Sequence, residues 1–247
     1  MNEVSWDEVR IRRNERGFVA GGTGTGKTFA SELLVQGFLN EYKKQNALAL
    51  ILDSKPRFRA QWLENGLSAA YLYRKWDHGQ AMRNSYLVNV ADSKASMRSS
   101  YSLGARMFIA TASRQSEFGL LLQAAERFFE DARAKQPRLL YVDEFMDFFN
   151  RNGTPIEKND ILLRAIRAGR ELGVSVVAAS QRTYQIPGQA LSEATKFYVF
   201  KLDNMDDLKH MVNFGLPKNL LAPTKDRRFL FYDKPRRLGA TVQLRVE

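Results

Sequence analysis

The sequence predicts an α/β fold with a central, mostly parallel sheet flanked by helices, and three observations predict it. Short apolar runs at residues 18–20, 48–52 and 139–142 are typical of strands buried on both faces. A glycine-rich segment, residues 21–28, follows the first run and leads into a helix-compatible stretch. The 247 residues suit one sizeable domain with a full core.

The remaining elements follow from the apolar periodicity, within a single domain that spans residues 1–247. Two helices are expected at residues 27–44 and 115–134, and the second turns Phe118, Leu121, Ala125 and Phe128 or Phe129 inward. A further helix ends at Gly173. Besides the three runs above, strands are expected at residues 70–73, 86–90, 107–110, 174–179, 197–200 and 228–232. Residues 1–16 form a basic N-terminal segment, and residues 206–247 form a basic extension that contains a strand.

The glycine-rich segment contains a complete G-x-x-x-x-G-K-[ST] phosphate-binding loop, in the strand–loop–helix context that this motif requires. Its glycines let backbone N–H groups turn toward a polyphosphate, and the helix N-terminus adds its positive dipole end. Lys27 is expected to reach the β- and γ-phosphates, and the Thr28 hydroxyl to hold Mg²⁺. A glycine-rich turn without a ligand is the alternative, and the full match disfavours it. The predicted ligands are ATP and Mg²⁺, bound by Gly21, Gly22, Thr23, Gly24, Thr25, Gly26, Lys27 and Thr28.

Two carboxylates end a later apolar run, at the sequence R-L-L-Y-V-D-E. The carboxyl end of a buried parallel strand faces the ligand crevice, so both side chains are expected beside the nucleotide. Asp143 is predicted to bind Mg²⁺, and Glu144 to act as the general base that polarises the attacking water. A strand that simply ends in a charged loop is the alternative, which the upstream phosphate loop makes less favourable.

The segment after these carboxylates supplies a polar amide and several arginines. Gln181 follows the strand at residues 174–179, where it can sense the γ-phosphate or position the lytic water. Arg170 lies just before that strand and is the preferred arginine finger, projecting toward the nucleotide of a neighbouring subunit. Arg167 is the second candidate. Together with Arg164, these side chains are also consistent with a solvated basic helix face.

In the order of these motifs, the chain resembles the HerA–FtsK superfamily of P-loop ATPases. The resemblance rests on G-x-x-x-x-G-K-T, I-L-D-S-K at residues 51–55, Y-V-D-E, and R-A-G-R-E-L-G-V-S-V-V-A-A-S-Q-R ending at Arg182. It covers roughly residues 17 to 205, and it implies a RecA-like P-loop NTPase fold of the ASCE class. It also implies the roles given above for Lys27, Thr28, Asp143, Glu144 and Gln181, with Arg170 at the G-R arginine position.

The composition indicates an anionic partner. The formal net charge is +11 and the isoelectric point is about 9.9. Such charge contacts phosphates without base specificity, which suits a motor that moves along any DNA sequence, although a solvated basic surface is the alternative. One basic group precedes the first strand, at Arg10, Arg12, Arg13 and Arg16. The predicted DNA-binding residues of the C-terminal region are Arg227, Arg228, Arg236 and Arg237.

The layout predicts a minimal DNA pump, closest to the viral genome-packaging ATPases of the superfamily. The expected partners are double-stranded DNA, other copies of the chain in a ring of five or six, and a viral portal or capsid vertex. The chain has no cysteine and no membrane-length apolar run, so a place in the host cytoplasm or on the virion is expected.

Two alternatives to the pump remain open. One is a conjugation or phage-assembly ATPase that moves single-stranded DNA or protein. The other is a P-loop kinase or nucleotide switch without pumping, although residues 157–160 do not supply the N-K-x-D motif of a GTPase. An L-S-G-G-Q signature is also absent from the sequence.

Overall fold

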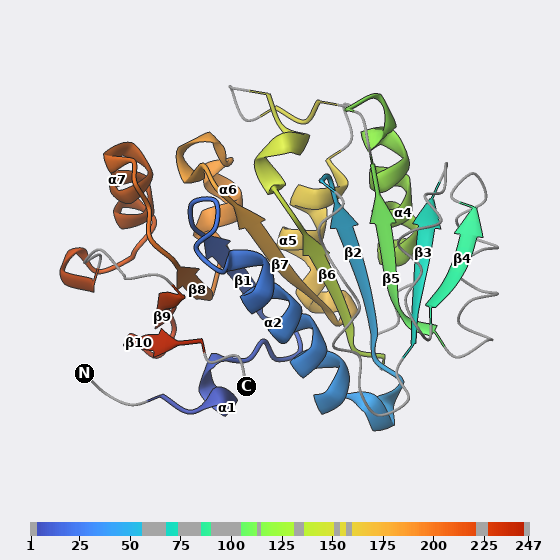
Figure 1. Ribbon diagram of the computed structural model, residues 1–247, viewed down its shortest axis with the longest axis horizontal. Helices are drawn as coiled ribbons and strands as arrows, with labels where there is room; N and C mark the ends of the chain where they lie inside the picture. Colours follow the sequence, from blue (N-terminus) through green and yellow to red (C-terminus); the bar gives the residue numbers. More distant parts are fainter. Residues whose placement is uncertain are drawn as a thin grey trace.

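One sheet organises the molecule (Figure 1). The computed structural model describes residues 4–55, 68–73, 85–89, 105–112, 115–130, 136–150, 154–156, 160–220 and 227–244. Within these residues, the strands form a ten-stranded sheet in the order β10-β9-β8-β1-β7-β6-β2-β5-β3-β4. Their bounds are β1 Arg16–Ala20, β2 Leu48–Asp53, β3 Ser68–Tyr73, β4 Ser85–Asn89, β5 Ala105–Thr111, β6 Arg138–Val142, β7 Val174–Ser180, β8 Lys196–Val199, β9 Arg228–Asp233 and β10 Leu238–Gln243.

The strands from β8 across to β4 run parallel, which confirms the mostly parallel sheet predicted from the sequence. At the other end of the order, β9 pairs antiparallel with β8, and β10 pairs antiparallel with β9. The extension that contains β9 and β10 therefore continues the central sheet. Strand β7 lies between β1 and β6. This order brings the ends of three central strands side by side, at the edge where the phosphate loop begins.

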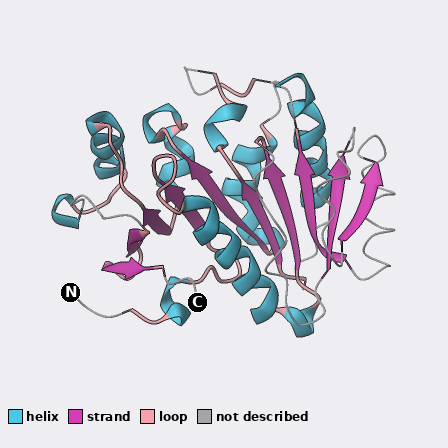
Figure 2. Ribbon diagram, in the orientation of Figure 1, coloured by secondary structure: helices cyan, strands magenta, loops and turns pink. Residues whose placement is uncertain are grey.

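Helices cover both faces of the sheet (Figure 2). Helix α2 lies on one face, and α4 and α5 lie on the other (Figure 1). The described helices are α1 Trp6–Val9, α2 Lys27–Glu41, α4 Phe118–Glu130, α5 Ile161–Leu172, α6 Gly188–Ser192 and α7 Met205–Asn213. Short 3-10 turns occur at η1 Lys43–Gln45, η4 Gln115–Glu117, η5 Phe145–Phe148, η6 Thr183–Gln185 and η7 Lys218–Leu220.

Alternation along the strands divides the core into two layers. Phe18 and Ala20 of β1 pack in the layer beneath α4 and α5, whereas Val19 packs with Leu34 and Phe38 of α2. Successive strand side chains point to opposite faces, so a strand covered on both faces must be apolar throughout. Each buried Val, Leu, Ile or Phe side chain contributes about 1.5–3 kcal/mol of transfer free energy. Because β1 is buried on both faces, its position in the sheet is fixed, and so is the point at which the following loop begins.

The predicted elements agree with the structure at most positions. The first helix ends at Glu41 and continues as the 3-10 turn η1, which shortens the predicted span of 27–44. The second begins as η4 and becomes α4 at Phe118, with its predicted inward side chains buried. Residues 131–134 of that prediction lie outside the described residues. The candidates at 70–73 and 86–90 correspond to β3 and β4.

Among the described α-helices and strands, four were not predicted: α1, α6, α7 and β10. The sequence did contain an N-cap residue for α7, Asn204. The Asn204 side chain accepts a hydrogen bond from the backbone N–H of Asp206 at 2.9 Å. Strand β10 is an edge strand of mixed polar and apolar residues, and it lacks the continuous apolar run of the central strands.

Candidate nucleotide-binding site

The phosphate loop leaves the carboxyl end of β1 and is tied to the strands on both sides. The backbone N–H of Gly21 donates to the Ser180 carbonyl at 3.3 Å, and that of Gly22 donates to the Lys201 carbonyl at 3.0 Å. Gly24 and Gly26 have φ values of 77° and 100°, in the left-handed region where side chains cost energy. Gly26 is also the N-cap of α2, so the loop delivers the chain into a helix N-terminus.

A cavity of about 410 Å³ opens over this loop. The Thr25 hydroxyl donates to the Gly22 carbonyl at 2.9 Å and braces the loop from within. The residues that line the cavity are Gly22, Thr23, Gly24, Gly26, Lys27, Thr28, Phe29, Gln181, Arg227 and Leu244. The structure thus gathers most of the predicted phosphate-loop residues and Gln181 around one cavity.

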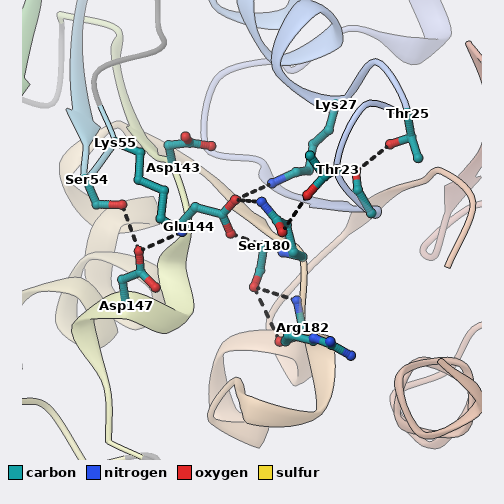
Figure 3. A network of polar contacts seen from close by, with 12 residues as sticks. Thr23, Thr25, Lys27, Ser54, Lys55, Asp143, Glu144, Asp147, Ser180 and Arg182 are labelled. Carbon is teal, nitrogen blue, oxygen red and sulfur yellow. Dashed lines mark hydrogen bonds and ion pairs between the residues drawn. The ribbon is translucent and has the colours of Figure 1, made fainter. Parts of the chain in front are cut away.

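Lys27, Glu144 and Gln181 meet at the rim of this cavity. The Lys27 ammonium lies 3.2 Å from Glu144 Oε1, and both side chains are buried (Figure 3). The Gln181 amide donates to the same Oε1, and its backbone N–H donates to Glu144 Oε2 at 3.2 Å. The Thr23 hydroxyl donates to Gln181 Oε1 at 3.0 Å. The network therefore links the loop to the ends of β6 and β7.

The Glu144 backbone is in the left-handed region, with φ 45° and ψ 55°. A non-glycine residue held there typically costs about 1–3 kcal/mol, and such residues cluster at functional sites. The sharp turn follows a strand whose side chains alternate between buried faces, and it redirects the carboxylate toward Lys27. The surrounding hydrogen bonds to both carboxylate oxygens hold this conformation.

Asp143 lies one residue earlier and is buried at the end of β6. Burial raises the pKa of its carboxyl; the Lys27 charge opposes this shift, and the Glu144 charge adds to it. The Tyr141 hydroxyl donates to Asp143 Oδ1 at 3.0 Å, and burial raises the pKa of that hydroxyl well above its usual value. A nearby divalent cation would stabilise the charged form of such a poorly solvated carboxylate.

The oxygen donors at the site fit Mg²⁺. Thr28 lines the cavity and Asp143 follows β6, and hydroxyl and carboxylate oxygens are the ligands that Mg²⁺ takes. In the part of the chain that the structure describes, no group of three or more His, Cys, Asp or Glu side chains could hold a metal by itself. Mg²⁺ usually binds through one or two protein groups plus substrate phosphates, so this sparse donor set is compatible with it.

A polar cluster beside the site had no role assigned from the sequence. Ser54 Oγ donates to Asp147 Oδ2 at 3.0 Å, and the Lys55 ammonium lies 3.4 Å from the same oxygen (Figure 3). These two contacts join the end of β2 to the 3-10 turn after Glu144. The motif I-L-D-S-K was the available signal, but Asp147 lies 92 residues after Lys55 and nothing in the sequence pairs them.

The structure does not bring Arg170 or Arg167 to this site within one chain. Both lie in the last turns of α5, and both are exposed. Strand β7, seven residues long and therefore roughly 20 Å, separates the end of α5 from Gln181. Arg167 has a weak partner, with Nη2 3.9 Å from Asp160 Oδ2. Because of this separation, neither arginine can contact a nucleotide in the cavity of its own chain. The separation does not prevent contact with a nucleotide in the cavity of a neighbouring chain.

The basic residues considered for DNA differ in burial and in position. Arg16 is buried, and its guanidinium donates to the carbonyls of Ile166 and Arg167 at the end of α5, so it is not available to DNA. Arg227 lines the cavity over the phosphate loop. Arg236 and Arg237 lie in the turn between β9 and β10, a strand length of about 20 Å away. The prediction that Arg227, Arg228, Arg236 and Arg237 bind DNA stays a prediction.

Comparisons with known proteins identify the fold. No family model matches the sequence, and no curated protein matches it. Among solved structures, the chain is similar to the genome packaging NTPase B204 from Sulfolobus turreted icosahedral virus 2 in complex with ATP-gammaS. The TM-score is 0.63 at 15% identity, over 94% of this chain and 98% of that one.

Two further solved structures extend this likeness. VirB4 of Thermoanaerobacter pseudethanolicus matches with a TM-score of 0.63 at 12% identity, over 94% of this chain and 89% of that one. The pCW3 conjugation coupling protein TcpA matches with a TM-score of 0.50 at 15% identity, over 93% of this chain and 60% of that one. The chain therefore has the RecA-like P-loop NTPase fold that the sequence predicted, and it shares this fold with these solved structures.

No described helix is both long enough and apolar enough to span a bilayer.

Proposed function

We propose that this protein is an ATPase, and the observation that carries the proposal is the convergence of Lys27, Glu144 and Gln181 beside the phosphate-loop cavity. A buried cation, a buried carboxylate and an amide at the ends of adjacent strands supply phosphate binding, proton abstraction and γ-phosphate sensing. The chain also has the fold of solved NTPases.

The residues divide the hydrolysis reaction between them. Lys27 leaves Glu144 for the β- and γ-phosphates of the bound ATP, where it offsets their charge. The freed Glu144 takes a proton from a water molecule whose oxygen attacks the γ-phosphorus. The bond from that phosphorus to the β–γ bridging oxygen breaks, and ADP leaves with the electron pair. Thr28 and Asp143 would hold Mg²⁺, which neutralises charge on the β- and γ-oxygens when bound.

The cargo that fits best is double-stranded DNA, moved by a ring of five or six copies that docks on a viral portal or capsid vertex. Three observations support this cargo: the net charge of +11, the exposed arginines at the β9–β10 turn, and the likeness to a viral genome packaging NTPase. The outward position of Arg170 favours a ring, because only a neighbour's nucleotide is open to it.

A conjugation or assembly ATPase is the second candidate, and the likeness to VirB4 and to the coupling protein TcpA favours it. Such a protein would move single-stranded DNA or a protein substrate. Because the catalytic residues would be the same in both candidates, the polymer that stimulates hydrolysis distinguishes between them.

The test is steady-state ATP hydrolysis with and without DNA, with Lys27→Ala as the control that removes the phosphate-binding charge. We expect hydrolysis that double-stranded DNA of any sequence stimulates. We also expect a log–log salt dependence of DNA binding with a slope of roughly −0.9 per phosphate neutralised. Stimulation by single-stranded DNA alone would favour the second candidate. Hydrolysis that ignores both polymers would overturn the DNA motor and leave an ATPase that moves protein, a kinase or a switch.

A further inference from the structure

The C-terminal hairpin consists of β9 and β10, and its two ends, Arg227 and Leu244, form one wall of the cavity. In the sheet order, β9 lies two strands from β1 on one side and β6 lies two strands from β1 on the other. Glu144 follows β6, so the carboxylate and the hairpin approach the phosphate loop from opposite sides. A nucleotide in the loop would therefore have the hairpin at the end away from Glu144.

The antiparallel direction of β9 brings its first residues to the loop. Leu230 pairs with Val199 near the carboxyl end of β8, and Gln243 of β10 pairs with Arg228. The start of β9 and the end of β10 therefore share the edge of the sheet at which the phosphate loop begins. A Cβ built on Gly26 would lie 3.5 Å from Leu244 Cδ1 and 3.8 Å from the Arg227 Cα. Arg227 and Leu244 thus lie directly beside the loop.

The Arg227 backbone is held in an unfavourable conformation. Its φ is 57°, in the left-handed region. Its carbonyl accepts the backbone N–H of Leu244 at 2.9 Å and the Gln243 amide at 3.4 Å, and these bonds fix the residue. The side chain is exposed toward the cavity rim. Strain that persists only because neighbouring contacts impose it is typical of ligand clamps.

The direction in which a nucleotide binds determines which part of it lies at this end of the cavity. Lys27 and Gln181 lie beside Glu144, where the terminal phosphate must be attacked. The rest of the nucleotide then extends past Thr28 and Phe29, toward Arg227 and Leu244. A planar guanidinium stacks on an aromatic base and an apolar side chain packs against the base or ribose, which together make a binding surface for a nucleoside.

We infer that the ends of the C-terminal hairpin close the nucleoside end of the cavity, with Arg227 stacking on the base and Leu244 packing beside it. This rests on the proposed ATPase function. It gives Arg227 a role in nucleotide recognition in place of the DNA contact predicted from its charge.

The experiment measures equilibrium binding of ATPγS and of inorganic tripolyphosphate, without DNA, to the wild type and to Arg227→Gly. Glycine adopts a φ of 57° without strain, so this variant loses the guanidinium while the fold is retained. Lys209→Ala, on the exposed face of α7, removes one positive charge away from the cavity and is the charge-matched control. We expect Arg227→Gly to bind ATPγS about tenfold more weakly, a change of about 1.4 kcal/mol. Tripolyphosphate binding should change no more than in the control.

Three results would overturn the inference: unchanged ATPγS affinity in Arg227→Gly, an equal loss in Lys209→Ala, or an equal loss of tripolyphosphate affinity. The last would place Arg227 on the phosphate chain. Failure of the ATPase proposal looks different, because a wild type that binds neither probe, and matches Lys27→Ala, would sink that proposal before the hairpin is tested.

Discussion

The two ends of the central strands present charge in opposite ways. At the carboxyl edge, Lys27 and Glu144 are buried and 3.2 Å apart, and Gln181 bonds to the same carboxylate. At the amino edge, where α5 ends, Arg167 and Arg170 are exposed and carry at most one weak ion pair within the described residues. The groups fixed by buried contacts lie at the cavity of their own chain. Groups that project outward are available to a second molecule.

The energetics of the two edges differ accordingly. Breaking a buried ion pair leaves one charge without compensation, which is strongly destabilising, whereas an exposed pair is worth at most about 1 kcal/mol. The carboxyl edge is therefore preorganised by its own fold. The exposed arginines of the amino edge cost the chain little to maintain, and their proposed role is toward a neighbouring subunit. The comparison predicts that damage at the first edge is confined to one subunit, and that damage at the second is shared between subunits.

Arg170→Ala is the strongest test of the outward edge. An arginine finger supplied by a neighbour is typically worth ~10³–10⁵ in hydrolysis rate, and we expect a loss of that order with ATP binding unchanged. Mixing Arg170→Ala with Glu144→Gln subunits should restore activity, because the first can take its arginine from the second. Steady-state hydrolysis across mixing ratios decides the matter. If no ratio gives rescue, the finger is another residue, and Arg167→Ala is the next variant to mix.

Glu144→Gln tests the buried edge. The substitution removes the general base but keeps the shape and a hydrogen-bonding oxygen, so ATP should stay bound while turnover falls by about 10²–10⁴. The measurement is single-turnover hydrolysis beside ATPγS affinity. Wild-type turnover in this variant would show that another group takes the proton.

Asp143→Asn should change the stability of the fold only slightly, and the change should be stabilising. Burial raises the pKa of Asp143 in the folded chain above its unfolded value, so the native state holds the proton more tightly. Stability contributed at this site is therefore lost as pH rises from the unfolded pKa through the folded one. Asparagine removes that loss, so we expect a slightly higher melting temperature at neutral pH, with hydrolysis abolished. Thermal unfolding across pH checks it, and a lower melting temperature in Asp143→Asn at neutral pH would contradict it.

The sequence by itself determined the fold class and the residues that are proposed to carry the chemistry. Continuous apolar runs predict buried parallel strands, and the loop at residues 21–28 requires a strand before it and a helix after it. These patterns are local, because they arise from side-chain periodicity and backbone sterics within a few residues. Glu144 and Gln181 could therefore each be placed at a strand end, and Lys27 at the start of the helix after the loop, before any contact between them was known.

Only the tertiary structure decided which strand ends meet, because pairing order depends on packing between segments far apart in the chain. It joined Lys27 to Glu144 across 117 positions, buried Arg16 beneath α5, and separated Arg227 from Arg237 along one hairpin. Charge alone led to one common prediction for these arginines, because every guanidinium looks alike in a sequence. Their surroundings differ in space: one lies among buried helix carbonyls, one beside a phosphate loop, and one in an exposed turn.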